Sequence, residues 1–487
     1  MHVLGRDDRL ANKDPMFNTR RERLGYKQVL HRSYSLFENF STSFAVLYFV
    51  GGVRVTFSTS IAVGGPLAYW TSYIVTCIFI FITTAVIAEV CSAAPTAGLI
   101  YLWAAEAGGR RFGRLFGFIV AWWNAGNTQS TVNYMLSELT VFEVDFPTDT
   151  GNIKFRALQW ICTEVMLALA AWINLASPRI FRYVFWLSTG AVFLDFILNL
   201  IWLPVGAHNT YGLRTAHEAF MTTYNGTGHV AEETKNASLN AAKGIFWSTV
   251  ISGALGFTAV ILFLFTSPPI DILFSYDAPQ PFVPLYAVVL GRGGHIVMNV
   301  LSVTALWLNT AIAITAASRL VFAVARDGVL PFSTWTSRVS EEGQPRNAIL
   351  VVWGVSALIT CTILPSAVAF TSLVSAAGVP SAAAYGLISL GRLTLTRKQK
   401  LEAKWSLGRW RVPFQIVAVV WNAWVVAVLF SPYEFPVQAG TLNYAPIIMA
   451  IVTVFAVVSW WVTPADAWLR QEFIEQAGAA SAASVDE

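Results

Sequence analysis

The chain has 487 residues, of which 55% are hydrophobic and only 12% are charged. A soluble protein usually has about a quarter of its residues charged, so the composition excludes an ordinary soluble domain and favours a polytopic membrane protein. The net charge of +4 does not indicate nucleic-acid binding, because the basic residues are distributed between the apolar segments. The four cysteines show no paired spacing, which argues against a disulfide framework and against a zinc site.

Residues 1–35 form a polar segment with eight basic and four acidic side chains, and we expect it to be a cytosolic tail. It lacks the apolar core of a cleavable signal peptide. Residues 36–463 contain the membrane-crossing segments, and residues 464–487 are expected to be a second, short cytosolic tail.

Eleven apolar segments are near 20 residues or longer, which is the length that a helix needs to cross a bilayer. The sequence therefore predicts an all-α bundle. The predicted spans are 36–60, 66–92, 114–137, 156–176, 181–205, 244–267, 293–325, 345–364, 366–391, 412–431 and 442–463.

The charges between the spans predict which loops share a side of the membrane. Loops 107–114, 176–182 and 392–411 are basic, so the positive-inside rule places them in the cytoplasm with the N-terminal tail. With eleven spans, however, loop 392–411 would face outward. One more crossing between residues 206 and 243 would remove the conflict, yet charged residues interrupt that segment throughout. We expect 206–243 not to span as a helix, with residues 208 and 240 on one side.

Several motifs carry a family resemblance. SRLVFAVARDGVLP (318–331) resembles the block that follows the eighth helix in the amino acid–polyamine–organocation (APC) transporters. LGYKQVLHRSYS (24–35) is similar to the lead-in of the fungal amino acid/choline branch, and EVCSAAPTAG (89–98) to the block that ends the second helix of the family.

The resemblance implies a LeuT/APC-type bundle of two inverted repeats with twelve spans, in which the first and sixth helices are broken at mid-membrane and bind substrate. HVAEETKNA (229–237) resembles the sequence that follows the sixth helix, but the crossing half of that helix is missing before it. We interpret this gap as an internal deletion, such as a skipped exon.

The first span contains the candidate break, Tyr48-Phe49-Val50-Gly51-Gly52-Val53. Two glycines inside a helix cost about 1 kcal/mol each relative to Ala, so they need a reason. Close helix packing is one reason, and a substrate site at Tyr48, Gly51, Gly52 and Val53 is the other.

Other polar residues in apolar spans are candidate substrate contacts, although each could equally hydrogen-bond a neighbouring helix. They are Asn124, Gln129, Asn309, Ser372 and Ser375.

Five charged residues are candidates for structural or gating roles. Arg54 lies inside the first span, where a charge costs at least ~2.5 kcal/mol unless it reaches a partner, water or the interface. Glu89, Glu164 and Asp195 are its possible partners, and snorkelling to the interface is the alternative. Glu89 itself, Arg319, Arg326 and Asp327 lie at the ends of spans, and Asp327 with Gly328 is expected to end the helix before Pro331.

The resemblance implies a secondary transporter that imports a small amino compound by alternating access, coupled to protons. An amino acid or 4-aminobutyrate is the expected substrate, with choline or a polyamine as the alternative. A transport-dead or sensor variant is also open because of the deletion. The loops contain no arrangement typical of a membrane enzyme, and we expect no cofactor and no metal.

The expected partners are therefore the lipid bilayer, the substrate and H+. The expected location is the plasma membrane, or else the vacuolar membrane, and nothing in the sequence specifies an oligomeric state.

Overall fold

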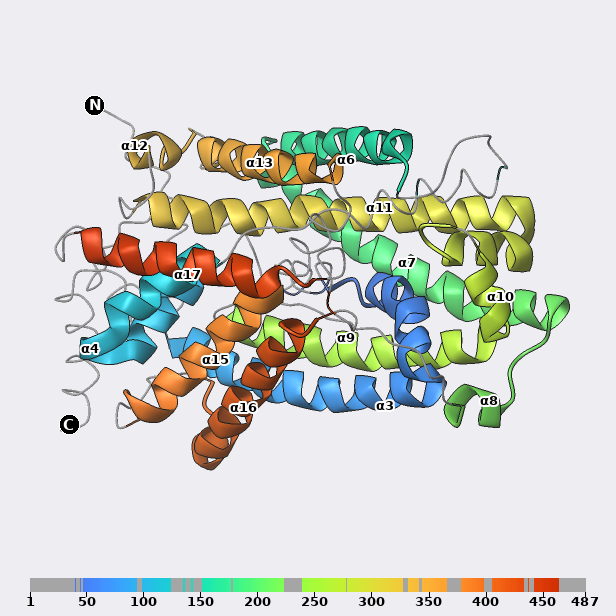
Figure 1. Ribbon diagram of the computed structural model, residues 1–487, viewed down its shortest axis with the longest axis horizontal. Coiled ribbons are helices and arrows are strands. Elements are labelled where there is room, and N and C mark those ends of the chain that lie inside the picture. Colours follow the sequence, from blue (N-terminus) through green and yellow to red (C-terminus); the bar gives the residue numbers. More distant parts are fainter. Residues whose placement is uncertain are drawn as a thin grey trace, which may run out of the picture.

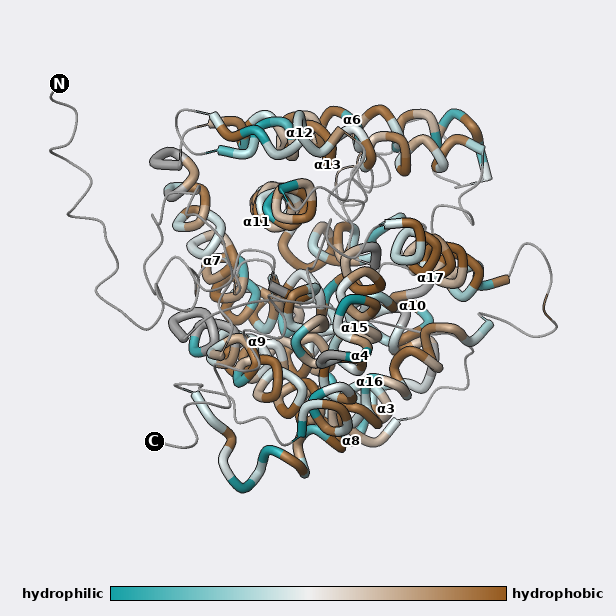
Figure 2. The backbone as a smooth tube through the Cα atoms, turned by 90° about the vertical axis from the view of Figure 1, so that its left-hand side faces the viewer, coloured by the Kyte–Doolittle hydropathy of each residue, from teal (hydrophilic) through white to brown (hydrophobic). Residues whose placement is uncertain are grey.

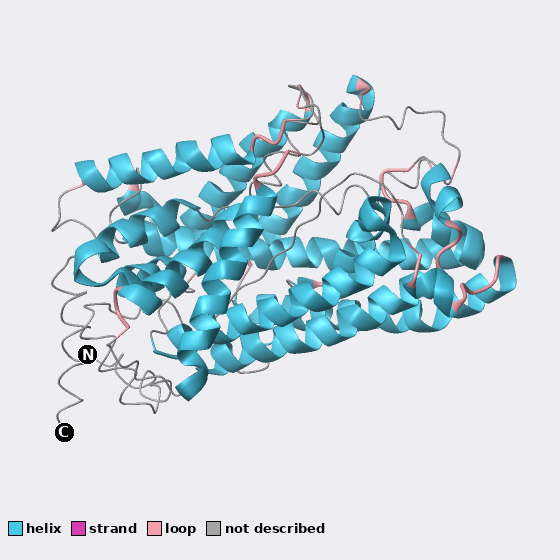
Figure 3. Cartoon of the chain, turned by 60° about the horizontal axis from the view of Figure 1, so that its bottom comes forward, coloured by secondary structure: helices cyan, strands magenta, loops and turns pink. Residues whose placement is uncertain are grey.

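The computed structural model is a bundle of long helices, and the residues that it describes contain no strand (Figure 1, Figure 3). It describes residues 47–93, 99–123, 151–176, 178–222, 239–276, 278–326, 332–340, 344–365, 378–397, 405–432 and 442–463, with Phe40, Phe44, Met135, Phe142 and Val437. The predicted tails 1–35 and 464–487 lie outside the described residues.

The helices follow the apolar segments of the sequence. The longer ones are α3 (Phe49–Ala93), α4 (Leu99–Trp123), α6 (Ile153–Asn174), α7 (Pro178–Thr210), α9 (Leu239–Thr266), α11 (Phe282–Arg326), α13 (Arg346–Thr360), α15 (Gly378–Thr394), α16 (Arg411–Leu429) and α17 (Ala445–Val462). The short ones are α8 (Ala216–Phe220), α10 (Ile270–Ser275), α12 (Ser333–Thr336), η2 (Cys361–Ile363) and η3 (Gly408–Trp410).

Eight helices within the described residues are long and apolar enough to cross a membrane. Their bounds lie within a few residues of eight of the predicted spans; Gly293–Arg326, for example, matches 293–325. The predicted spans 36–60, 114–137 and 366–391 fall partly outside the described residues. Apolar runs dominate the helices (Figure 2), and large apolar side chains such as Trp172 and Trp461 are exposed, as a lipid-facing surface requires.

Three of the longer helices, α3, α4 and α11, are interrupted by a glycine with positive φ, which in α4 is Gly109 (φ 59°). α3 turns at Gly65 (φ 75°), so Phe49–Gly64 and Pro66–Ala93 are separate rods, and α11 turns in the same way at Gly291 (φ 68°). Such a backbone conformation is open to glycine without steric cost. We call the two ends of the bundle the Gly65 end and the Ala93 end, after the residues at which the second rod of α3 begins and ends.

α9 runs antiparallel to the second rod of α3 and lies beside it (Figure 1). A Cβ on Gly256 would meet the Tyr73 hydroxyl, and one on Gly253 would meet the ring of Phe81. Near its start, the ring of Phe246 contacts Trp405, whose backbone N–H donates to Ser92. The beginning of α9 therefore lies at the Ala93 end of the bundle.

The end of α9 lies at the Gly65 end, next to the end of α7. The Arg214 N–H donates to the Phe265 carbonyl, and the Tyr211 hydroxyl donates to the Thr266 carbonyl over 2.6 Å. Close by, the Leu67 N–H donates to the Thr222 carbonyl. α7 and α9 are thus parallel, and the residues on either side of 223–238 lie at opposite ends of the bundle.

This arrangement corrects the expectation that residues 208 and 240 share a side. That expectation assumed that a segment without an apolar span returns to the side from which it left. The carbonyls at the end of α9, however, are bound by residues 211–214 at the end of α7. With α9 parallel to α7, the basic segments no longer conflict. The predicted loop 107–114 lies within α4, around its turn at Gly109. A Cβ on Gly391 would touch Ala107, so this segment and the part of α15 that precedes loop 392–411 meet at the Ala93 end.

Candidate functional site

The first helix is interrupted at Tyr48. Residues 47 and 49 are helical, whereas Tyr48 has a φ of 32°, which non-glycine residues rarely adopt. The predicted break therefore lies at the first residue of the motif. Gly51, Gly52 and Val53 are already part of helix α3.

The two glycines of the motif have different surroundings. A Cβ on Gly51 would lie 2.1 Å from Cε1 of Tyr48, so the tyrosine ring rests directly on this glycine. A Cβ on Gly52 would meet nothing within 4 Å. Of the two reasons offered by the sequence, close packing accounts for Gly51, and the packed neighbour is a residue of the same motif.

Arg54 is fully buried and forms an ion pair with Asp195, which is also fully buried. Arg54 lies eleven residues before Gly65 and Asp195 fifteen before the end of α7, which correspond to ~16 Å and ~22 Å of helix. The pair therefore lies deep within a hydrocarbon layer of about 30 Å. Asp195 is the partner that Arg54 takes among the three carboxylates that the sequence left open, and Glu164 instead accepts from Thr360.

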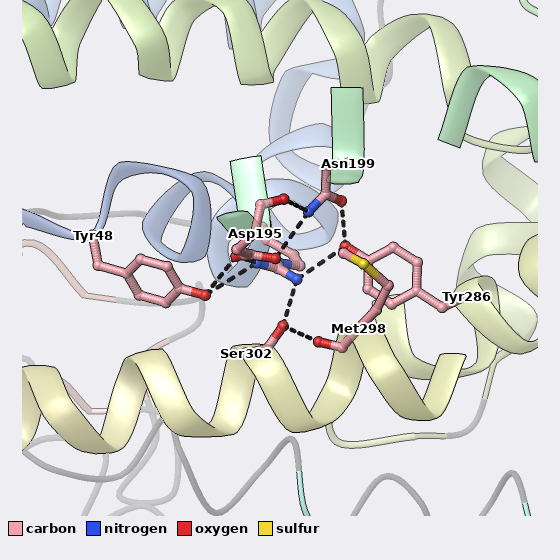
Figure 4. Close-up of polar contacts among 7 residues, drawn as sticks. Tyr48, Asp195, Asn199, Tyr286, Met298 and Ser302 are labelled. Atoms are coloured by element: carbon pink, nitrogen blue, oxygen red, sulfur yellow. Dashed lines mark hydrogen bonds and ion pairs between the residues drawn. The ribbon is translucent and has the colours of Figure 1, made fainter. Parts of the chain in front are cut away.

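Other polar side chains from three helices complete the network around the pair (Figure 4). The Tyr48 hydroxyl donates to Oδ2 of Asp195 over 2.6 Å, and Nδ2 of Asn199 donates to Oδ1 over 3.0 Å. Nη1 of Arg54 donates to the Ser302 hydroxyl (2.7 Å) and to the Tyr286 hydroxyl (3.0 Å), and Tyr286 in turn donates to Asn199 (2.6 Å). Both carboxylate oxygens accept hydrogen bonds, so the buried charges are compensated as burial requires.

Sequence reasoning did not identify Asn199, Tyr286 or Ser302. Asn199 follows Asp195 by four positions and so shares its helix face, and that spacing was a usable signal. Tyr286 lies in the first rod of α11 (Phe282–Leu290), which is too short to appear as a span. Ser302 is one of several residues of α11 that carry a hydroxyl, with Thr304, Thr310, Thr315 and Ser318, so nothing in the sequence singles it out.

Aromatic rings surround the broken helix next to the pair. Phe44 stacks on Phe193 with ring centroids 5.0 Å apart, and Phe49 meets Phe196 edge-on at 5.3 Å. The guanidinium carbon of Arg54 lies 5.7 Å from the centroid of the Tyr286 ring. A cation entering this region would find ring faces in addition to a carboxylate.

The remaining predicted residues divide into three groups. Asn309 is half-buried on α11, seven residues or about 10 Å of helix beyond Ser302 toward the Ala93 end. Asn124, Gln129, Ser372, Ser375 and Asp327 lie outside the described residues. Glu89, Arg319 and Arg326 lie near the Ala93 ends of α3 and α11, away from the Arg54–Asp195 network.

At the Ala93 end, Glu89 holds the chain that leads into α16. The carboxylate accepts from the Leu407 N–H (3.0 Å) and from the Ser406 hydroxyl (3.2 Å), and Nε of Arg411 lies 3.5 Å away. Glu89 therefore joins the end of α3 to the residues that lead into α16.

The geometry defines a helical membrane protein with a broken first helix and a compensated pair of charges in its core. Comparison with known proteins is consistent with that class. The family model described as "Amino acid permease" matches residues 219–455. The solved structure of a manganese transporter from Eremococcus coleocola covers 92% of this chain with a TM-score of 0.51 at 11% identity, which shows a shared fold only.

Two curated relatives extend the match along the chain. The thiamine transporter thi9 of Schizosaccharomyces pombe is 42% identical, over 99% of this chain and 92% of its own length. The amino-acid permease BAT1 homolog of Oryza sativa subsp. japonica is 29% identical, over 93% and 95%. The chain belongs to the amino acid permease family of the APC superfamily, a family of membrane transporters and not of enzymes, as the sequence motifs predicted.

The alignment with thi9 also bears on the missing crossing. It extends over 541 residues, whereas this chain has 487, so at least 54 residues of the aligned stretch have no counterpart here. A deficit of that size is large enough to contain a membrane-spanning helix.

Proposed function

We propose that the Arg54–Asp195 pair, beside the break at Tyr48, is the charged part of a binding site for a small amino compound. The observation that carries this proposal is the depth of the pair. Two charges that face no water are costly to bury, and a hydrophobic pair of similar volume is often as stable. Such a pair in the core of a transporter is most simply explained by a charged solute.

The pair can recognise a solute by exchanging partners. A zwitterion, such as an amino acid or 4-aminobutyrate, would place its ammonium group on Asp195 and its carboxylate on Arg54. A solute with only a positive charge, such as thiamine, choline or a polyamine, would interact with Asp195 and with the ring face of Tyr286. The 42% identity to a thiamine transporter makes thiamine the first cation to test.

Neutralising each member of the pair separates these two classes. In Asp195→Asn both classes should lose affinity, because each needs the carboxylate. In Arg54→Gln a zwitterion should lose affinity at least tenfold, whereas thiamine should keep its affinity or gain. The measurement is equilibrium binding of labelled thiamine, 4-aminobutyrate and a set of amino acids to the purified full-length chain. Equal binding by wild type and Asp195→Asn would contradict the proposal.

The double variant Arg54→Gln with Asp195→Asn is the control for loss of binding through misfolding. It removes both charges together and so leaves no unpaired buried charge. We expect it to fold and not to bind either class of solute.

We further propose import across the plasma membrane by alternating access, coupled to protons, with the N-terminus in the cytoplasm. The orientation is supported by the basic segment 107–114, which meets the part of α15 that precedes the basic loop 392–411 at one end of the bundle. Uptake of the bound compound into proteoliposomes with and without an inward proton gradient tests the coupling. Uptake that ignores the gradient would contradict it.

A second function, a binding protein that does not transport, is favoured by the alignment with thi9, in which at least 54 residues have no counterpart in this chain. It predicts saturable binding by the purified chain without uptake into proteoliposomes. Sequencing the transcript across the codons for Thr222 to Glu233 tests its origin: an mRNA that encodes this chain without a break supports a non-transporting product, and extra in-frame codons for an apolar segment would restore the twelve-span permease.

A further inference from the structure

Tyr48 combines three unusual features in one side chain. Its backbone has a φ of 32°, and among the described non-glycine residues only Phe332 shares a positive φ. Its ring is 2% exposed, although it lies at a break in a helix. Its hydroxyl donates to Oδ2 of Asp195 over 2.6 Å and accepts from Nη2 of Arg54 over 3.2 Å. A strained residue that persists in a structure must be held by its surroundings.

The ring of Tyr48 packs directly against Gly51. Three ring atoms of Tyr48 lie within 2.8 Å of the place where a Cβ of residue 51 would be, so an alanine there and the present ring position exclude each other. One residue further along, Gly52 is exposed and a Cβ would be unopposed. The sequence motif Gly-Gly thus contains one glycine that the ring requires and one that it does not.

The position of the ring decides the position of the hydroxyl. Asp195 receives one hydrogen bond on Oδ1, from Asn199 four residues away on the same helix. Oδ2 is held from the opposite side, by Arg54 and by Tyr48, which both belong to the first helix. If the ring left Gly51, Oδ2 would lose its Tyr48 donor. Arg54 would then be the remaining contact between the Asp195 carboxylate and the first helix.

We infer that Tyr48 and Gly51 form one positioning unit, in which the glycine seats the ring so that the hydroxyl orients the Asp195 carboxylate. Tyr48 is a positioning residue and not itself a charged contact of the solute. That the oriented carboxylate receives a solute rests on the proposed function. The seat and its coupling to Asp195 are properties of the folded chain and can be measured without any solute.

The seat is tested by thermal unfolding of the purified full-length chain. Gly51→Ala should lower Tm by several degrees, whereas the matched control Gly52→Ala should not lower it, because alanine is the better helix former and its Cβ would be unopposed. In a Tyr48→Ala background, where the ring is gone, Gly51→Ala should cost nothing further. The packing of the Tyr48 ring on Gly51 would be contradicted if the two glycine variants changed Tm equally. It would also be contradicted if Gly51→Ala lowered Tm as much in the Tyr48→Ala background as in wild type.

The hydroxyl is tested with Tyr48→Phe, which keeps the ring on Gly51 and removes only the donor. It should lower Tm in the wild-type background and not in Asp195→Asn, because the coupling needs the carboxylate. Identical Tm changes in the two backgrounds would overturn the positioning role.

Solute binding gives a readout that simple packing would not move. Tyr48→Phe should weaken binding of thiamine or 4-aminobutyrate, whichever the wild type binds, about tenfold at a saturation level equal to that of wild type. Unchanged affinity would contradict the positioning role. If the wild type binds neither compound, nor any amino acid, the proposed function fails, and the two unfolding experiments still decide the inference.

Discussion

The structure contains two carboxylates that each join distant parts of the chain, and they lie in opposite environments. Asp195 meets Arg54 in the core, with both side chains 0% exposed. Glu89 meets Arg411 at the Ala93 end, where the side chain of Arg411 is 20% exposed. Asp195 is held by side chains from the first helix and α7, whereas Glu89 is held mainly by a backbone N–H and a hydroxyl of the chain before α16.

The difference shows what each carboxylate can do. Around Asp195 every partner of the carboxylate is a side chain, so under the proposed function a solute would replace one of them without moving the backbone. Around Glu89 the strongest contact is to backbone, which cannot leave without moving the loop. We therefore propose solute binding for the first carboxylate and anchoring of the chain before α16 for the second, and the following experiments test that division.

The largest expected effect is a difference in the side of the membrane from which residues 208 and 243 can be labelled. In a chain whose four native cysteines are replaced, His208→Cys introduces a thiol at an exposed position near the end of α7. Lys243→Cys introduces one at an exposed position near the beginning of α9. The parallel arrangement predicts that a membrane-impermeant maleimide labels one of them from outside and the other only after permeabilisation. Labelling of both from the same side would contradict the placement of α9.

Breaking the core pair should cause the largest loss of stability. Arg54→Gln or Asp195→Asn leaves a buried charge without its partner, which costs about 3–5 kcal/mol. The double variant should recover most of that loss. Tm and chemical unfolding of the purified chain measure this, and additive effects of the two substitutions would show that the pair does not act as a unit.

Substitutions in the contact between Glu89 and Arg411 at the Ala93 end should cost less stability than those in the core pair, and the two substitutions should differ in their cost. Glu89→Gln weakens hydrogen bonds to a charged acceptor and should cost about 1–3 kcal/mol. Arg411→Gln should cost about 0–1 kcal/mol, because its contact is partly exposed. Loss of the anchor should also speed trypsin cleavage within the basic loop 392–411. A larger effect from Arg411 than from Glu89 would reverse the roles given to them.

The smallest effect is expected at the cap of α8. Hydrogen bonds from the backbone and hydroxyl of Thr215 lower the pKa of the exposed Glu218 carboxyl. A carboxyl whose pKa is lower in the folded state stabilises above its unfolded pKa, near 4.3, and loses this contribution as the pH falls. Glu218→Gln should therefore have a slightly lower Tm than wild type at pH 7, and the gap should close below pH 4. A gap that widens on acidification would contradict the cap.

The sequence predicted most of the spans because their lengths and hydrophobicity are set locally by the bilayer. It also predicted that Arg54 must reach a partner, water or the interface, since an isolated charge in a membrane helix is costly, and it left pairing and snorkelling open. It could not choose Asp195 over Glu89 or Glu164, because that choice depends on which helices cross at the same depth.

Two further features depended on three-dimensional arrangement. Gly51 and Gly52 are equivalent in the sequence and differ only through the fold of Tyr48. The orientation of α9 could not be inferred from hydropathy, because residues 211–214 fix it through hydrogen bonds to carbonyls more than 50 positions away. The charges of the basic segments agree with the observed arrangement of the helices. The lack of an apolar run between residues 206 and 243 led to the wrong expectation for residues 208 and 240.

The most direct test of the central claim is equilibrium binding of labelled thiamine and 4-aminobutyrate to the purified wild type, Asp195→Asn and Glu89→Gln. We predict saturable binding of one of the two compounds by wild type and by Glu89→Gln. We predict no binding by Asp195→Asn, and none by the double variant Arg54→Gln with Asp195→Asn, although the double variant recovers most of the stability that the single variants lose. Binding that survives in Asp195→Asn, or is lost equally in Glu89→Gln, would contradict a solute site at the core pair.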